Sequence, residues 1–238
     1  MVQKNNSAFT LIELLVVISI IAILAALAVP ALTNALNKGQ MTGTMNNARQ
    51  MYLAGFQMAT DGAANSDPNY SWPGNDAAVT SLEDYCEKLV GNDYLKAGDL
   101  QKILNAPGAN CTVTYDAAAT PPSLTVSGTS ALKVYRVTDT DPSNTIFAVT
   151  SNYTYNTALS PTAAPYGEKG FVVMRKGGDA GTYRKNQATA AGFGAGTTGQ
   201  DKLLSTVGRL SGHAEGTQLP TGDNGRNLTN PTGSTTQP

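Results

Sequence analysis

A long apolar run near the N-terminus, broken by one carboxylate, limits what this chain can fold into more than any other feature. Residues 9–29 are apolar or small except for Thr10, Glu13 and Ser19. As a helix rising about 1.5 Å per residue, this run would be roughly 32 Å long, which matches a hydrocarbon core of about 30 Å. An isolated segment in lipid must satisfy its backbone hydrogen bonds internally. The run therefore predicts a transmembrane helix, which we expect Pro30 to end or kink.

Glu13 is the only charged residue between Phe9 and Asn37. An unpaired carboxylate in lipid costs on the order of a few kcal/mol, and an ionisable residue in a membrane span is a functional hypothesis by default. A cation from another chain would remove that cost, because opposite charges attract far more strongly at low dielectric constant. We therefore expect Glu13 to favour lateral packing of helices. The alternative is a passive side chain that reaches water at the interface.

The stretch from Ala8 to Leu32 resembles the N-terminus of type IV prepilins and type II secretion pseudopilins. Those proteins have a short polar leader, a cleavage site before a Phe, a Glu four residues later, and an apolar helix with a Pro near its end. The resemblance implies cleavage between Ala8 and Phe9, methylation of the new Phe9 amine, and pairing of Glu13 with the Phe9 ammonium of a neighbouring subunit. Ala8 stands where the family usually has Gly, and it is also a small residue.

A secretory signal peptide is a second interpretation of the same segment. Lys4 would be its basic start, residues 14–24 its apolar core, and residues 26–28 its small-residue cleavage site, so that the mature chain would begin at Val29. The carboxylate inside the apolar region and the length of the run both disfavour this interpretation. The two hypotheses predict different mature N-termini.

The composition fits an exported protein. Charged residues make up 14% of the chain and the formal net charge is −1, so the sequence offers no basic surface for nucleic acid. The two cysteines, Cys86 and Cys111, are predicted to form a disulfide in an oxidising compartment. The alternative is a pair of separate buried thiols.

After Pro30 the helix is expected to continue to about Thr60 and to end at Asp61-Gly62, with one buried stripe formed by Met41, Met45, Ala48, Tyr52, Gly55 and Ala59. The resulting division is a leader at 1–8, a long helix at 9–61 with 9–30 in the membrane, a periplasmic globular domain at 62–215, and a disordered tail at 216–238.

The domain is predicted to be α+β, with an antiparallel sheet packed on the second half of the long helix. Two short helices are expected, the first capped by Thr80 or Ser81 and running to about Val90, and the second near residues 99–105. The candidate strands are residues 111–115, 123–127, 131–137, 145–155 and 170–176.

Few residues offer chemistry beyond assembly. The Gly-rich run 194–199 lacks a preceding strand and is interpreted as a flexible loop, and the single histidine, His213, has no partners for catalysis. Asp139, Asp141 and Asn144 are calcium candidates, because oxygen ligands alternate there, although the same residues are ordinary turn formers. A mild basic region is expected to be a solvated strand edge or a contact for a neighbouring subunit or acidic partner, and comprises Lys169, Arg175, Lys176, Arg184 and Lys185.

The sequence thus indicates a structural subunit rather than an enzyme, with no cofactor other than the calcium considered above. The resemblance implies a precursor in the bacterial inner membrane, with a single pass and a periplasmic domain. It also implies three kinds of partner, namely prepilin peptidase, an inner-membrane assembly platform, and other pilin-like subunits in a filament. A type II secretion pseudopilin is favoured over a type IV pilin of a surface filament because Cys86 and Cys111 lie in the middle of the domain. A secreted or anchored binding protein that never polymerises is the remaining alternative.

Overall fold

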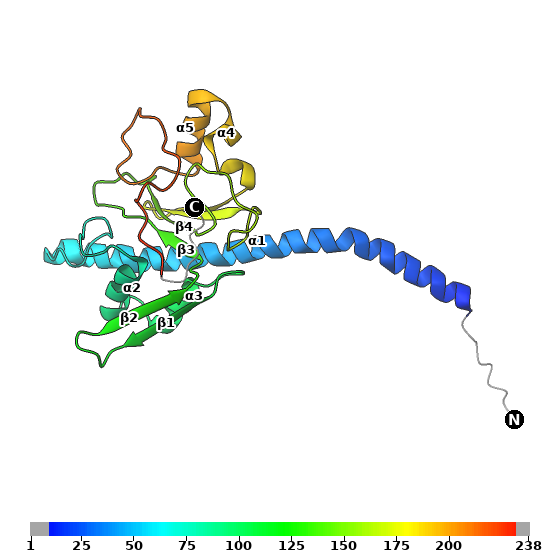
Figure 1. Cartoon of the computed structure of the whole chain (residues 1–238), viewed down its shortest axis with the longest axis horizontal. Coiled ribbons are helices and arrows are strands. Elements are labelled where there is room, and N and C mark those ends of the chain that lie inside the picture. Colours follow the sequence, from blue (N-terminus) through cyan, green and yellow to red (C-terminus); the bar gives the residue numbers. More distant parts are fainter. Residues whose placement is uncertain (1–9, 232–238) are drawn as a thin grey trace. The chain divides into compact units, whose positions relative to one another are not determined.

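The computed structural model describes residues 10–231, which belong to two compact units that meet between Gly39 and Gln40. The predicted leader, the Ala8–Phe9 cleavage site and residues 232–238 lie outside the described part. The elements are drawn in Figure 1. Each unit is described below by itself.

Helix α1 (Leu11–Asn65) begins in the first unit, where its apolar side chains are exposed around the whole circumference. This is the pattern of a helix that needs an apolar environment outside its own chain. The helix runs through Pro30, as the predicted continuation to about Thr60 requires, so Pro30 does not end it. A proline removes one backbone N–H and therefore one bond of the helical ladder. The carbonyl of Pro30 accepts a hydrogen bond from the Thr33 hydroxyl at 2.9 Å.

The part of α1 in the second unit carries the predicted stripe, which is buried except at the half-buried Met45 and is widened by several small and sulfur-containing residues. Its exposed face includes Asn46, Arg49, Gln50 and Gln57. The helix ends at Asn65, not at Asp61-Gly62. Gly62 marks a close approach instead of a stop, because a Cβ there would lie 1.7 Å from the backbone oxygen of Tyr70. The buried residues of α1 are Met41, Thr44, Ala48, Met51, Tyr52, Ala54, Gly55, Met58, Ala59 and Gly62.

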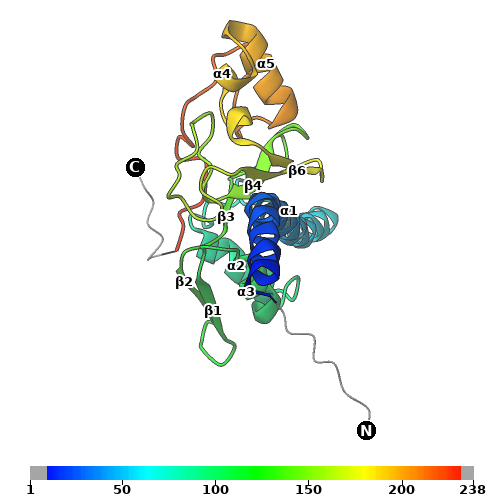
Figure 2. The same cartoon turned by 90° about the vertical axis from the view of Figure 1, so that its right-hand side faces the viewer.

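Two layers pack against this part of α1, and the two views in Figures 1 and 2 place them on different sides of it. One layer is an antiparallel sheet in the order β3-β4-β5-β6. The other contains α2 (Leu82–Gly91), α3 (Ala97–Ile103) and the hairpin of β1 (Cys111–Asp116) and β2 (Ser123–Gly128). The sheet strands are β3 (Leu132–Val134), β4 (Ile146–Thr150), β5 (Phe171–Arg175) and β6 (Ala180–Tyr183). This arrangement confirms the α+β prediction.

Both faces of the sheet are buried, so all five residues of β4 are buried. Phe147 and Met174 belong to an inner core with α1 and α2. Ile146, Val149 and Phe171 belong to an outer core, which is completed by Tyr153, Tyr155, Leu159, Leu203, Val207, Leu210 and Leu219. The outer core explains why β4 lacks the alternating pattern of a half-exposed strand.

The outer layer contains elements that the sequence did not predict, namely β6, the 3₁₀ helix η1 (Lys185–Gln187), α4 (Ala190–Phe193) and α5 (Gly196–Thr206). The prediction of a flexible loop at 194–199 is wrong, because α5 begins inside it. Gly199 is buried, and a Cβ there would lie 2.2 Å from the backbone oxygen of Gly194. The glycine therefore serves close backbone packing rather than flexibility.

The prediction of a disordered tail from residue 216 is also wrong for residues 216–231. Leu219 is buried in the outer core and Leu228 in the inner core. The Asp223 carboxylate accepts hydrogen bonds from the Tyr135 hydroxyl at 2.6 Å and from the Tyr155 backbone N–H at 3.0 Å, and it forms an ion pair with Lys133. A few long-range partners thus order a segment whose composition alone is typical of disorder.

Candidate functional site

The first turn of α1 forms a capping box around Glu13. Glu13 Oε2 accepts the backbone N–H of Thr10 at 2.8 Å and the Thr10 hydroxyl at 2.7 Å. The Thr10 hydroxyl in turn accepts the backbone N–H of Glu13 at 3.3 Å. The sequence Thr10-Leu11-Ile12-Glu13 matches the S/T-x-x-E pattern that produces this arrangement. Sequence reasoning did not identify Thr10, although this pattern was visible.

The capping box and the helix dipole both stabilise the negative charge of Glu13 within its own chain. The carboxylate has donors within its own chain, and it lies at the positive end of the helix dipole, where a negative charge is stabilised. Its isolation in an apolar run is therefore less complete than its sequence neighbours indicate. Ile12, Val16 and Val17 line a hollow beside it, so a polar group is presented next to an apolar helix surface.

The apolar surface below this turn is large. Within residues 10–231, α1 is the helix that is long and apolar enough to cross a membrane, and its most apolar window is not covered by any other part of the described chain. The large side chains of Leu11, Ile12, Ile23 and Leu27 are each more than 60% exposed. Apolar area of this extent marks a surface that contacts lipid or other helices. Phe9, the predicted partner of Glu13 across subunits, lies outside the described residues.

The calcium candidates belong to one loop, where the Asp141 carboxylate accepts hydrogen bonds from its own loop and from the segment at residues 211–212. It accepts the Ser211 hydroxyl at 2.7 Å, the Thr138 backbone N–H at 2.8 Å and the Gly212 backbone N–H at 3.1 Å. Burial favours a higher pKa for Asp141, but the hydrogen bonds from Ser211, Thr138 and Gly212 outweigh it and the pKa is lowered. The oxygen atoms of this carboxylate are thus already used to fold the loop.

Lys176 supplies the cation of the same loop. Its ammonium donates to the backbone oxygen of Asp139 at 2.7 Å and to that of Asp141 at 2.6 Å, and it lies 5.9 Å from the centre of the Trp72 ring. The Asp139 carboxylate accepts the Asn75 side-chain amide at 2.6 Å. For Asn144, the interaction seen is its backbone oxygen accepting the Arg209 N–H at 3.1 Å. No group of three or more His, Cys, Asp or Glu side chains suited to a metal occurs within residues 10–231, and calcium binding stays a prediction.

Cys86 and Cys111 are both buried in the inner core as free thiols. The two thiols are not bonded to each other in this structure, and Cys111 lies close enough to affect the pKa of Cys86, so the disulfide stays a prediction for the exported protein. Burial raises the pKa of both thiols, and the pKa of Cys111 reaches about 11. Such thiols are poor nucleophiles at neutral pH.

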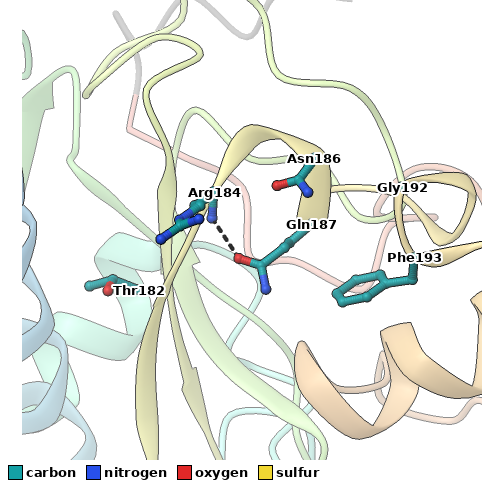
Figure 3. A pocket seen from close by; sticks show the side chains of 6 residues that line it. All are labelled: Thr182, Arg184, Asn186, Gln187, Gly192 and Phe193. Carbon is teal, nitrogen blue, oxygen red and sulfur yellow. Dashed lines mark hydrogen bonds between the residues drawn. The ribbon is translucent and has the colours of Figure 1, made fainter.

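In the predicted basic region, most of the cationic side chains have a partner within the described chain, and one has no carboxylate partner there. Arg175 pairs with Asp179, Lys185 pairs with Glu168, and Lys176 holds the loop described above. For Arg184, the described part of the chain shows no carboxylate partner, and this residue lines a pocket (Figure 3). Lys169 also has a partner within the chain.

His213 lies close to Arg209, and burial followed by this positive charge lowers its pKa. Its Nε2 atom is buried and has no hydrogen-bond partner in the described structure. A catalytic histidine needs both a nucleophile and an orienting partner. The surroundings of His213 therefore give no support for an acid–base role.

Comparison with known proteins gives one result. Residues 3–29 match the family model described as the prokaryotic N-terminal methylation motif. The comparisons with curated proteins and with solved structures gave no match. The match covers the N-terminal segment alone and confirms it as a type IV pilin-like segment, and it includes Thr10, Glu13 and the predicted cleavage site.

Proposed function

We propose that this protein is a structural subunit of a pilus-like filament and, within that class, a type II secretion pseudopilin. The observation that carries the proposal is the placement of Glu13. It lies in the first turn of an apolar helix, within a segment that matches the N-terminal methylation motif. An α+β domain follows the same helix, as pilin-like subunits require. In this role the chain is not an enzyme, and force comes from assembly driven by other proteins.

Processing would occur at the start of α1. Prepilin peptidase would cut between Ala8 and Phe9, and the new Phe9 amine would be methylated. The mature chain would then begin at Phe9, one residue before Thr10 and four residues before Glu13. The protein would sit in the inner membrane with a single span, and its domain of residues 40–231 would face the periplasm.

Assembly would depend on the negative charge of the Glu13 carboxylate, which the capping box stabilises in the monomer. Thr10 keeps the Glu13 carboxylate hydrogen-bonded in the monomer, and a neighbouring Phe9 ammonium would provide a full positive charge in its place. The Thr10 bonds are charge-assisted only through the carboxylate acceptor, whereas an ammonium would add a full opposite charge, whose attraction a low dielectric constant strengthens. Exchange of the Thr10 donors for the neighbour's ammonium would therefore favour the filament over the isolated subunit.

The mid-domain cysteines favour the secretion pseudopilin over a type IV pilin of a surface filament. Neither candidate needs calcium for the Glu13 interaction. Calcium at Asp139, Asp141 and Asn144 would compete with the Lys176 ammonium for the loop oxygens.

The test combines processing and assembly in cells that express the full chain. Mass analysis of the mature protein should show a start at Phe9 with one added methyl group. Glu13→Ala and Glu13→Gln should stop incorporation into filaments while membrane insertion is kept. Ser19→Ala is the control, because Ser19 is a further polar residue of the span and its hydroxyl donates within its own helix, to Val16 O at 2.7 Å.

Thr10 variants separate the capping box from the charge. Thr10→Ser keeps both bonds to Glu13 and should assemble normally, whereas Thr10→Val loses the hydroxyl and should reduce assembly without abolishing it. A mature chain that begins at Val29, or filaments formed equally well by Glu13→Ala and Ser19→Ala, would show the proposal to be wrong.

A further inference from the structure

The outer layer contains a polar pocket of about 470 Å³ that the filament role does not use. It lies between strand β6, the 3₁₀ helix η1 and helix α4, and its lining is Thr182, Arg184, Asn186, Gln187, Gly192 and Phe193 (Figure 3). The pocket is open, because Thr182, Arg184, Asn186 and Gly192 are exposed, and its volume falls within the range of small-molecule sites, about 300–1,000 Å³. A single carboxylate from a neighbouring subunit would leave most of this space empty.

Internal hydrogen bonds fix the walls of the pocket. The Gln187 side-chain oxygen accepts the Arg184 backbone N–H at 2.9 Å, and Figure 3 shows the amide nitrogen directed away from this bond. Asn156 Oδ1 accepts the Ala190 backbone N–H at 2.8 Å, which ties the start of α4 to the domain. The Tyr153 hydroxyl donates to the backbone oxygen of Ala188, a residue with 0% exposure. The pocket is thus formed before any ligand arrives.

Gly192 allows the close packing that positions Phe193, the aromatic residue of the pocket. A Cβ at Gly192 would lie 1.6 Å from the backbone oxygen of Asn186, so only glycine permits α4 to approach η1 this closely. The Thr189 hydroxyl caps the same turn by accepting the Gly192 N–H at 3.2 Å. Phe193, which follows, points toward the side of the pocket bounded by β6 and Arg184 (Figure 3).

The chemistry of the lining specifies a ligand with one negative charge, several hydroxyl groups and an apolar ring face. The Arg184 guanidinium has no carboxylate partner in the described chain, and its planar fork matches a carboxylate. The Asn186 and Gln187 amides offer both donors and acceptors to hydroxyl groups. The negative face of the Phe193 ring attracts the weakly positive C–H face of a saturated sugar ring.

We propose that this pocket binds a hexuronic acid, either as a free sugar or as a residue of an acidic polysaccharide. The carboxylate would pair with Arg184, the hydroxyl groups with Asn186 and Gln187, and the C–H face of the ring with Phe193. Phosphate is a poorer fit, because phosphate sites gather several cations or a run of backbone N–H groups, whereas this pocket has one cation.

The test uses the full chain in detergent micelles and saturation-transfer NMR with D-galacturonate. Its controls are D-galactose, which has the same ring without the carboxylate, inorganic phosphate, and a glutamate tripeptide. Galacturonate should receive saturation, and the three controls should give far weaker signals. A galacturonate trimer that binds more tightly than the monosaccharide would assign the site to polysaccharide, and equal binding would assign it to the free sugar.

Variants then locate the site. Arg184→Gln should weaken binding by about tenfold, the loss expected for one charge-assisted hydrogen-bonded pair, and Arg184→Lys should have a smaller effect because it keeps the charge without the fork. Phe193→Leu should also weaken binding. Arg49→Gln is the matched control, since Arg49 is exposed on α1 and the substitution changes the net charge equally.

The proposal is overturned if galacturonate does not bind, if galactose, phosphate or the peptide binds equally well, or if Arg184→Gln and Arg49→Gln bind alike. Unchanged thermal unfolding of Arg184→Gln excludes loss of the fold as the cause. Filament formation by Arg184→Gln should be normal, so failure here leaves the filament proposal intact.

Discussion

The contact between Gly55 and Tyr85 gives a prediction that the structure specifies in detail. Gly55 lies in the buried stripe of α1, and a Cβ placed there would be 2.0 Å from Tyr85 Oη and 3.3 Å from Tyr85 Cζ. Tyr85 is fully buried on α2, and its hydroxyl has no hydrogen-bond partner in the described structure. The hydroxyl therefore occupies the space that any larger residue at position 55 would need.

Two opposing effects determine the result of Gly55→Ala. Replacing a mid-helix glycine by alanine favours the helix by about 1 kcal/mol, whereas overpacking a close-packed core costs about 1–3 kcal/mol. A separation of 2.0 Å is far inside van der Waals contact, so the cost falls at the upper end of this range. We expect a net loss of about 2 kcal/mol.

Tyr85→Phe should reverse the loss. By itself it removes a buried hydroxyl without a partner, which is neutral or stabilising by about 1 kcal/mol. In the double variant the alanine methyl fills the vacated space, and the closest remaining atom, Cζ, is 3.3 Å away. The double variant should therefore be at least as stable as the parent, with a coupling free energy of about 2–3 kcal/mol between the two sites.

Urea and thermal unfolding of the full chain in detergent, followed by near-ultraviolet circular dichroism, measures all four proteins. A difference of 1 kcal/mol corresponds to about 2–4 °C for a domain of this size. Gly43→Ala is the matched control, because it lies in the same helix, is exposed and has nothing within 4 Å of its Cβ position. Gly43→Ala should be stabilising. The reasoning fails if Gly55→Ala behaves like Gly43→Ala, or if Tyr85→Phe does not rescue it.

The remaining predictions concern the loop and the thiols. The pKa of Asp141 is lowered in the folded protein, so its contribution to folding stability is present above its ordinary pKa and is lost as pH falls through the folded value. Asp141→Asn should lower the unfolding temperature at pH 6 and should lose less further stability than the parent between pH 5 and pH 3. The same loss of stability between pH 5 and pH 3 in the variant and the parent would contradict this. The Lys176 ammonium is bonded to the loop oxygens, so adding calcium or a chelator should not change the unfolding temperature of the parent. Lys176→Met should lower the unfolding temperature. An unfolding temperature that rises with calcium would instead support a metal site. In the reduced protein, Cys86 and Cys111 should resist alkylation until the domain unfolds. The intact mass of the exported protein should be two hydrogens lower if the predicted disulfide forms, and an intact mass with two thiols would contradict that disulfide.

The sequence predicted those parts of the fold that depend on local pattern. The stripe from Met41 to Ala59 is set by the helical period, and it is buried as expected except at Met45, which is half-buried. Ser81 was proposed as a helix cap, and it forms a capping box with Asp84, with the Asp84 backbone N–H donating to the Ser81 hydroxyl at 3.0 Å. These features require only neighbours three or four residues away, and sequence reasoning reaches them.

The elements that were missed depend on distant partners. Strand β6 has the sequence Ala180-Gly181-Thr182-Tyr183, which has little strand preference of its own and pairs with β5. Helix α5 begins with Gly196, and Leu203 anchors it in the outer core. The ordered segment 216–231 depends on Leu219, Leu228 and the bonds to Asp223. No local pattern could have revealed these contacts, because their partners are supplied by other elements.

The candidate assembly site was predicted in part for the same reason. Glu13 was identified because a charge in an apolar run is conspicuous, yet Thr10 was overlooked because it was judged by polarity and not by its spacing from Glu13. The spacing matters because it explains how one carboxylate can serve two states. In the monomer it must be tolerated next to lipid, and the Thr10 donors provide this. In a filament it must be available to a stronger partner, and two hydrogen bonds from neutral groups in the first turn of a helix can be exchanged for an ammonium more readily than an ion pair could. A subunit whose Glu13 already formed an ion pair within its own chain would gain little from a neighbour. In the proposed filament, the weakness of the capping box relative to a salt bridge would therefore leave free energy for assembly.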